Sequence, residues 1–96
     1  MFVTIVEGTV EAAREDDLRS AWTDMTAGAP PAGFIESSLL KAEGGTWRIV
    51  TVWESEEAVV AMRASGEPPA APRMFERAGS VPVVSLWTVE GRVSGT

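Results

Sequence analysis

Trp53 stands at the junction of two sequence patterns in the stretch TVWESEEAVV, residues 51–60. The β-branched residues before it favour a strand, whereas Ser55 can cap a helix and Glu56 and Glu57 suit the positive end of the helix dipole. A strand therefore leads into a helix here with almost no loop. A large indole at such a junction either fills a core or lines a ligand pocket, and the residue alone leaves both interpretations open.

Few charged side chains are candidates for catalysis. Arg73 lies among prolines and is either an exposed charge or a group that stabilises an anion or enolate. Glu7 and Glu36 are candidate bases, although carboxylates on strands are more often solvated or at a subunit rim. The acids at positions 54, 56 and 57 are most simply helix-start charges.

The chain contains no cysteine, histidine or tyrosine. The lack of thiols excludes disulfides and thiol chemistry, and the lack of imidazole excludes a Ser-His-Asp triad. Zinc, copper and haem-iron sites are disfavoured because they depend on these ligands. We therefore expect no metal site and no bound cofactor.

The composition is that of an acidic globular protein. The 96 residues are 45% hydrophobic and 23% charged, with a net charge of −6 and a single lysine, Lys41. This balance predicts one domain over residues 1–96 and disfavours nucleic acid and anionic membranes as partners. Residues 1–10 have neither a basic segment nor an apolar run long enough for a signal peptide or a membrane span, so we expect a cytoplasmic protein.

The elements that position these side chains follow the order β, α, β, β, α, β. Strands are expected at 2–10, 33–41, 46–53 and 81–93, and helices at 14–25 and 55–65, with a further turn or two of helix at 73–78. Gly8 is expected at a bulge or a close approach. This order predicts an α+β, ferredoxin-like sandwich, in which a four-stranded antiparallel sheet carries both helices on one face.

The second face of the sheet needs a partner. Arg48, Val50 and Val52 share one side of their strand, opposite Trp47, Ile49, Thr51 and Trp53. Two helices cover only one side, and the other carries too many branched apolar groups to face water. We therefore expect a homodimer whose sheets pack face to face around a barrel-like centre. The alanine-rich helices predict space for a ligand between the sheet and helices of each subunit.

Three short motifs, Gly33-Phe34, Trp53-Glu54-Ser55 and Glu57-Ala58, resemble those of the antibiotic biosynthesis monooxygenase family. In that family a glycine begins the second strand, Trp-x-Ser ends the third, and Glu-x-Ala begins the next helix. The resemblance extends from Phe2 to about Val89. It implies a dimeric α/β barrel and an oxygenase activity, which forms quinones in some members and degrades haem in others.

The resemblance also implies roles for individual residues. Trp53 matches the tryptophan that lines the quinone-forming site, and Arg73 falls near the place of a pocket arginine. Ile49 and Val59, however, stand where those enzymes have an asparagine and a tyrosine, so two polar partners are missing. Other candidates for the pocket lining are Trp22, Met62 and Phe75.

The haem-degrading branch is disfavoured by the same comparison. It relies on an asparagine, a tryptophan and a histidine, and the matching places here are Val6, Met62 and about Pro72. None of these three positions therefore has the residue type found in the haem-degrading enzymes.

Three functions remain open from the sequence. The first is a cofactor-independent monooxygenase for an electron-rich, hydrophobic aromatic molecule such as a phenol or anthrone, whose own anion delivers an electron to oxygen. The second is a non-catalytic small-molecule binder or accessory dimer of the same fold. In the third, the fold serves only assembly, and Trp22, Met62 and Phe75 fill the cavity.

Overall fold

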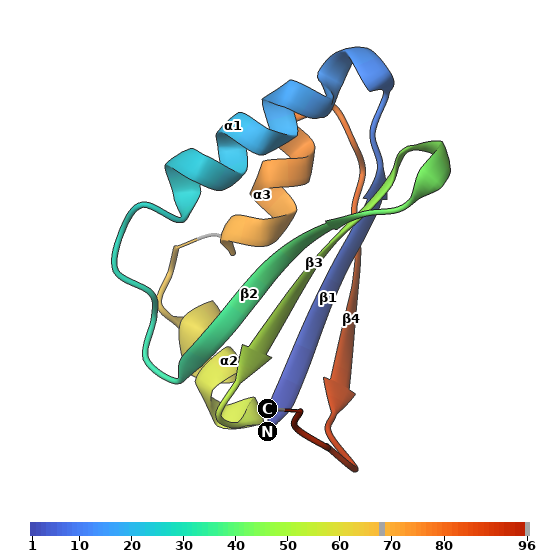
Figure 1. The fold of residues 1–96 in the computed structure, drawn as a ribbon. Coiled ribbons are helices and arrows are strands. Elements are labelled where there is room, and N and C mark those ends of the chain that lie inside the picture. Colours follow the sequence, from blue (N-terminus) through green and yellow to red (C-terminus); the bar gives the residue numbers. More distant parts are fainter. Residues whose placement is uncertain (68, 96) are drawn as a thin grey trace.

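One antiparallel sheet carries the helices on one of its faces (Figure 1). The computed structural model describes residues 1–67 and 69–95. Its elements are β1 (Phe2–Thr9), η1 (Ala12–Arg14), α1 (Glu15–Met25), β2 (Phe34–Lys41), η2 (Glu43–Gly45), β3 (Thr46–Trp53), α2 (Glu56–Ala64), α3 (Ala70–Arg77) and β4 (Val83–Thr88). The four strands lie in the order β2-β3-β1-β4. The predicted ferredoxin-like α+β fold is thereby confirmed.

Two elements differ in length from the prediction. The turns expected at 73–78 belong to α3, which already begins at Ala70. Pro72 is tolerated there because it lies in the first turn, where the backbone N–H has no partner within the helix. The last strand ends at Thr88, well before residue 93, because Thr88 pairs with Phe2, the first residue of β1.

Alternate residues divide the sheet into a helix-facing side and an open side. Burial alternates along β1 and β3 as the sequence predicts, with Phe2, Thr4 and Val6 buried on the first strand. Val84 pairs with Val6 and therefore belongs to the helix-facing side of β4, whereas Trp87 belongs to the open side.

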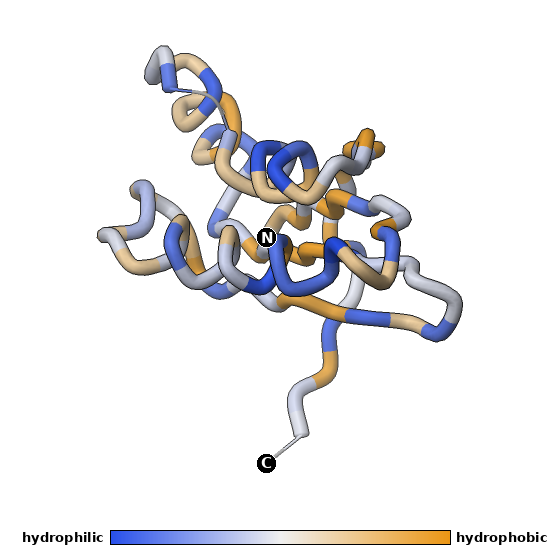
Figure 2. Tube along the Cα trace, turned by 90° about the horizontal axis from the view of Figure 1, so that it is seen from above, coloured by the Kyte–Doolittle hydropathy of each residue, from blue (hydrophilic) through white to orange (hydrophobic). Residues whose placement is uncertain are grey.

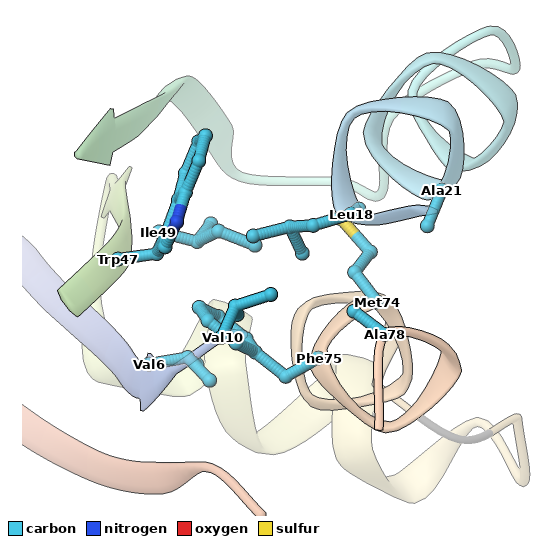
Figure 3. Packing of buried hydrophobic residues seen from close by; sticks show 9 residues of the cluster. All are labelled: Val6, Val10, Leu18, Ala21, Trp47, Ile49, Met74, Phe75 and Ala78. Carbon is cyan, nitrogen blue, oxygen red and sulfur yellow. The ribbon is translucent and has the colours of Figure 1, made fainter. Parts of the chain in front are cut away.

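The larger hydrophobic cluster fills the space between the sheet and helices α1 and α3 (Figure 3). Its buried members are Val6, Val10, Leu18, Ala21, Trp47, Ile49, Met74, Phe75 and Ala78. Phe75 and Leu18 have no exposed surface. Where the sequence predicted a pocket, the side chains of this cluster therefore pack together.

A smaller cluster lies under α2, at the opposite end of the sheet. It consists of Phe2, Trp53 and Val59, with Phe34, Ala58 and Met62 packed around them. No residue is shared between the two clusters.

Gly8 lies at a close approach between β1 and α3, as its position in a strand predicted. A Cβ atom at this residue would lie 2.6 Å from Ser80 Oγ and 2.8 Å from Phe75 Cδ1. The pairing of β1 with β3 runs without interruption through Gly8, so the alternative of a bulge is wrong here.

The open side of the sheet is apolar, as predicted. Its apolar side chains, all half-buried or exposed in the single chain, are Val3, Ile5, Leu40, Val50, Val52, Val83 and Trp87. Hydrophobic stretches run through the middle of the trace, where the strands lie (Figure 2). Glu7 and Arg48 form an ion pair across β1 and β3 on this side. Among the described helices, none is both long and apolar enough to cross a membrane.

Candidate functional site

The three motifs singled out in the sequence meet at the end of β3. Gly33 has a φ of +82°, and a Cβ there would lie 2.4 Å from the Cβ of Ala58, so a side chain would push α2 away from β2. The Glu54 N–H donates to the Gly33 carbonyl at 2.8 Å. Ser55 Oγ accepts from the Ala58 N–H at 3.3 Å, which confirms the predicted helix cap. Direct contacts thus join Gly33 to Glu54 and Ala58, which lie more than 20 residues further along the chain.

Trp53 is held at the centre of this junction. Its side chain is buried, with 4% exposed, and its Nε1–H donates to Thr4 Oγ1 at 3.1 Å. The ring of Phe34 meets it edge-on, with 5.8 Å between centroids and 85° between planes. A hydrogen bond and an aromatic contact therefore fix both the polar and the apolar part of the indole.

The residues predicted to form the site do not gather in one place. Trp22, Ile49 and Phe75 belong to the larger cluster or pack against it, Trp53, Val59 and Met62 lie in or against the smaller one, and Arg73 is exposed on α3. The hydrogen bonds and ion pairs found within residues 1–67 and 69–95 do not include the Arg73 guanidinium. The functional roles of these seven residues stay predictions.

Ile49 and Val59 occupy apolar surroundings. They are 1% and 2% exposed and lie in different clusters. Core packing surrounds both side chains, so neither position offers a polar group to a ligand.

The two carboxylates considered as bases lie on the wrong side of the sheet. Glu7 pairs with Arg48 on the open side, and Glu36, opposite Val52, also belongs to that side. The backbone of the sheet separates both from the indole of Trp53, which packs toward the helices. Neither carboxylate is placed to act next to that indole.

A surface hollow of about 940 Å³ lies at the far end of the sheet, between the start of α1 and the turn that joins β2 to β3. Its lining includes Val10, Arg14, Glu15, Lys41 and Gly45. None of the seven predicted site residues lines it. The sequence analysis missed this hollow, although the AEGG turn of residues 42–45 and Glu15, the first residue of α1, belong to its lining.

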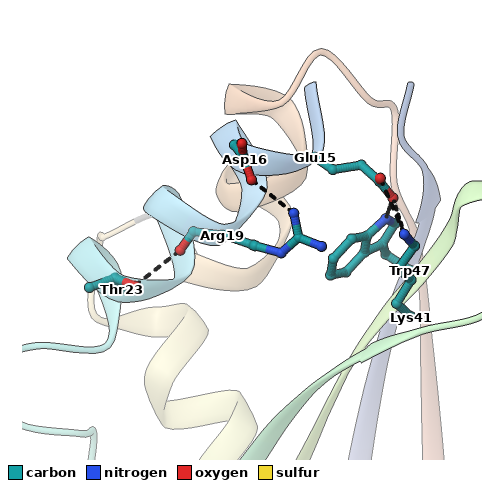
Figure 4. A network of polar contacts seen from close by, with 6 residues as sticks. All are labelled: Glu15, Asp16, Arg19, Thr23, Lys41 and Trp47. Atoms are coloured by element: carbon teal, nitrogen blue, oxygen red, sulfur yellow. Dashed lines mark hydrogen bonds and ion pairs between the residues drawn. The ribbon is translucent and has the colours of Figure 1, made fainter. Parts of the chain in front are cut away.

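A polar network beside this hollow joins α1 to the sheet (Figure 4). Glu15 Oε2 accepts from Trp47 Nε1–H at 2.8 Å and lies 3.1 Å from Lys41 Nζ. Lys41 and, to a lesser degree, Trp47 lower the pKa of Glu15 by hydrogen bonding to its carboxylate. The guanidinium of Arg19 lies 5.1 Å from the centroid of the Trp47 ring. These contacts stabilise the ionised carboxylate of Glu15, which suits a structural contact between α1 and the sheet rather than a catalytic base.

A family model for antibiotic biosynthesis monooxygenases matches residues 1–71. The chain belongs to this family. The matched residues include all three motifs that meet at Trp53, whereas Arg73 and Phe75 lie beyond the match.

Solved structures show that this antibiotic biosynthesis monooxygenase family member has the fold of its relatives. A candidate antibiotic biosynthesis monooxygenase from Deinococcus radiodurans is 12% identical, with 100% of this chain and 99% of that chain covered and a TM-score of 0.75. SnoaB, a cofactor-independent oxygenase from Streptomyces nogalater, is 20% identical over 98% and 97% of the two chains, with a TM-score of 0.71. The haem-degrading protein of Mycobacterium tuberculosis is 26% identical over 98% and 100%, with a TM-score of 0.68. No curated protein matches the sequence.

The side chains of this family member do not fit haem. The sequence has no histidine, cysteine or tyrosine to supply an imidazole, thiolate or phenolate to the iron. Within the part of the chain that the structure describes, no group of three or more acidic side chains is arranged to hold a metal ion either.

Proposed function

We propose that residues 1–96 form one domain that oxygenates an electron-rich, hydrophobic aromatic molecule such as a hydroxyanthrone, without a resident cofactor. The observation that carries this proposal is the junction at Trp53, where the family's motifs contact one another around a buried indole. Membership of the monooxygenase family supports the reaction class.

The reaction balances with oxygen as the only co-substrate. The anthrone methylene loses a proton to water, and the resulting carbanion gives one electron to O₂. The radical pair combines to form a carbon–oxygen bond, and the peroxide takes up a proton and then loses water to leave a carbonyl. One oxygen atom enters the product and the other leaves as water, so the four electrons lost by carbon are the four that reduce O₂.

In this proposal the protein contributes orientation and a dry environment. Phe34, which is half-buried, offers an aromatic surface to a flat ligand, and Trp53 holds the Phe34 ring in place by its edge-on contact. The apolar cluster around them excludes water from the anion. Arg73 keeps its proposed role as a positive charge that stabilises the anion.

Oxygen consumption with 1,8-dihydroxyanthrone tests this function. The wild-type protein should accelerate uptake beyond the spontaneous oxidation, and Trp53→Phe should lower the enzymatic rate about tenfold or more by misplacing the ligand. Val60→Ala is the control, because Val60 lies on α2, is 58% exposed and belongs to neither cluster. If stoichiometric amounts of the protein gave no oxygen uptake above background, the proposed oxygenase activity would be refuted.

The burial of Ile49 and Val59 favours a second candidate, a binding protein that keeps the family fold without its chemistry. Such a protein should be stabilised by 9,10-anthraquinone in thermal melts and leave the spontaneous rate of anthrone oxidation unchanged. Stabilisation together with catalysed uptake would reject it.

The proposal also includes a second copy of the chain as partner. The seven apolar residues of the open side need cover, and a face-to-face arrangement of two sheets would provide it.

A further inference from the structure

Side chains on the open side of the sheet form rows that cross all four strands. Strand pairing gives a first row of Leu40, Arg48, Glu7 and Val83, in the strand order β2-β3-β1-β4 (Figure 1). The second row is Ser38, Val50, Ile5 and Ser85, and the third is Glu36, Val52, Val3 and Trp87. The middle of the sheet lies between β3 and β1, so each row has two residues on either side of it.

The first row is complementary to its own reverse. Its outer members, Leu40 and Val83, are both apolar and are 47% and 69% exposed. Its inner members are a cation, Arg48, and an anion, Glu7, which form an ion pair within the chain. When two copies of this row run in opposite directions, apolar side chains therefore meet apolar ones and each charge meets its opposite.

The other rows also match their own reverse at the inner strands. In the second row Val50 would meet Ile5, and the outer members are both serines. In the third row the inner members are both valines. A two-fold axis that lies midway between two facing sheets, parallel to the strands, reverses every row in this way. The open side is therefore suited to a second copy in that orientation.

The opposite orientation, with the two-fold axis across the strands, suits the charges poorly. It would bring the first row against the third, so that Arg48 would meet Val52 and Glu7 would meet Val3 of the partner subunit. The ion pair would then lose water without gaining an opposite charge from the other copy, which is unfavourable. The charges thus favour the axis along the strands.

The ion pair has room and unused bonding capacity for a partner. The side chains of Glu7 and Arg48 are 42% and 55% exposed. A carboxylate has two acceptor oxygens and a guanidinium has five N–H donors, so each group can serve one pair within the chain and another across an interface. Sheets that pack face to face are about 10 Å apart, a gap that these two long side chains can bridge together. A hollow of about 230 Å³ beside the pair, bounded by Ile5, Val83, Ser85 and Trp87, gives space for side chains of the other copy.

We propose that a second copy of this chain covers the open side with the two-fold axis along the strands, and that Glu7 and Arg48 of each copy pair with the partner's Arg48 and Glu7. The four charges then alternate in sign around the axis. They fix the orientation of two sheets whose apolar contacts alone would also permit the reversed arrangement. The inference rests on the second copy in the proposed function and does not depend on oxygenase activity.

Charge reversal tests the pairs between copies by sedimentation at micromolar protein. Glu7→Arg gives four positive groups around the axis and Arg48→Glu gives four negative ones, so each variant alone should dimerise at least about 100-fold more weakly than wild type. An equimolar mixture of the two variants should again sediment at twice the chain mass, and the double variant Glu7→Arg/Arg48→Glu should dimerise like wild type. Arg63→Glu makes an equal change of charge on α2 and, as the matched control, should leave the dimer intact.

Thiol cross-linking tests the orientation with both charges in place. The chain has no cysteine, so Leu40→Cys/Val83→Cys supplies all the thiols. A short bismaleimide should join two copies of this variant, because position 40 of one copy faces position 83 of the other. Within one chain the two positions are three strand spacings, about 14 Å, apart, beyond the reach of the reagent. Leu40→Cys is the matched control and should give little product of double mass on a denaturing gel.

The outcomes separate this inference from the proposed second copy. Wild-type protein that sediments as a single chain would overturn both. Single charge variants that dimerise like wild type, or a mixture of them that stays as single chains, would overturn the inference alone. Equal cross-linking of the double and single cysteine variants, or no product from a dimeric double variant, would also overturn it alone. If the charge variants do not fold, the cross-linking decides.

Discussion

At the scale of single residues, Gly8 has no space for a side chain. Changing it to alanine would bring a methyl group within 2.8 Å of the Phe75 ring in the larger cluster. Overpacking of this kind costs about 1–3 kcal/mol, and each kcal/mol lowers the melting temperature of a domain this size by roughly 4–8 °C. We therefore expect Gly8→Ala to melt several degrees below wild type in circular dichroism.

Gly28→Ala is the control for this prediction, because no other part of the molecule lies within 4 Å of a Cβ at that position. Its stability should stay within about 0.5 kcal/mol of wild type. Equal melting temperatures for the Gly8 and Gly28 variants would mean that α3 moves away from β1 without cost.

At the scale of secondary-structure elements, Ser55 caps the N-terminus of α2 beside Trp53. Replacing it with alanine removes the acceptor of the Ala58 N–H and should cost about 1 kcal/mol of folding free energy, within a usual range of about 0.5–2. Urea unfolding measures this loss as a lower midpoint at unchanged slope. Ser94→Ala, in the exposed C-terminal segment, should be neutral, and an equally small effect at Ser55 would contradict the capping role.

The contacts of Glu15 with Lys41 and Trp47, which join α1 to the sheet, predict that the stability of the fold depends on pH. Lys41 and Trp47 hold the folded-state pKa of Glu15 below its ordinary value of 4.5. The group is therefore ionised more easily in the folded protein, so its contribution to stability is present above pH 4.5 and is lost as the pH falls through the lowered folded-state value. Melting temperatures measured from pH 7 down to pH 3 should fall at the acidic end.

Glu15→Gln isolates this contribution, because its amide oxygen can still accept from the Trp47 indole while the charge is absent. The variant should be less stable than wild type near pH 7, and the two melting curves should converge below pH 4.5. A difference that is the same at every pH would assign the acid sensitivity to other carboxylates.

At the scale of the whole molecule, the open side of the sheet predicts self-association. Wild-type protein at micromolar concentration should sediment with twice the chain mass of 10.2 kDa. Val50→Glu would place a charge on the side of the sheet that a second copy is proposed to cover. It should give single chains, because an unpaired charge buried between two sheets is strongly unfavourable.

Val60→Glu is the matched control, since Val60 lies on α2, is 58% exposed and belongs to neither cluster. It should sediment like wild type. Sedimentation of folded wild-type protein as a single chain would rule out the face-to-face dimer.

Much of the fold follows from neighbours in the chain. The β-branched runs, the alternation of side chains and the Ser55 cap are local features, so the element order and the two faces of the sheet could be predicted from the sequence. The start of α3 and the end of β4 could not be predicted in this way. The start of α3 at Ala70 depends on how a proline fits a first turn, and the end of β4 depends on where its partner strand begins.

The features of the candidate site can also be separated into those that the sequence predicts and those that depend on tertiary structure. The sequence by itself determined that Trp53 ends a strand, that Ser55 begins a helix and that imidazole and thiolate chemistry are excluded, because residue type and adjacent positions decide these points. Only the tertiary structure decided that Trp53 donates to Thr4, that Phe75 packs into the space predicted for a ligand, and that Arg73 is exposed. Strand register and the rotation of each helix set these relations, and both arise from packing between residues far apart in the chain.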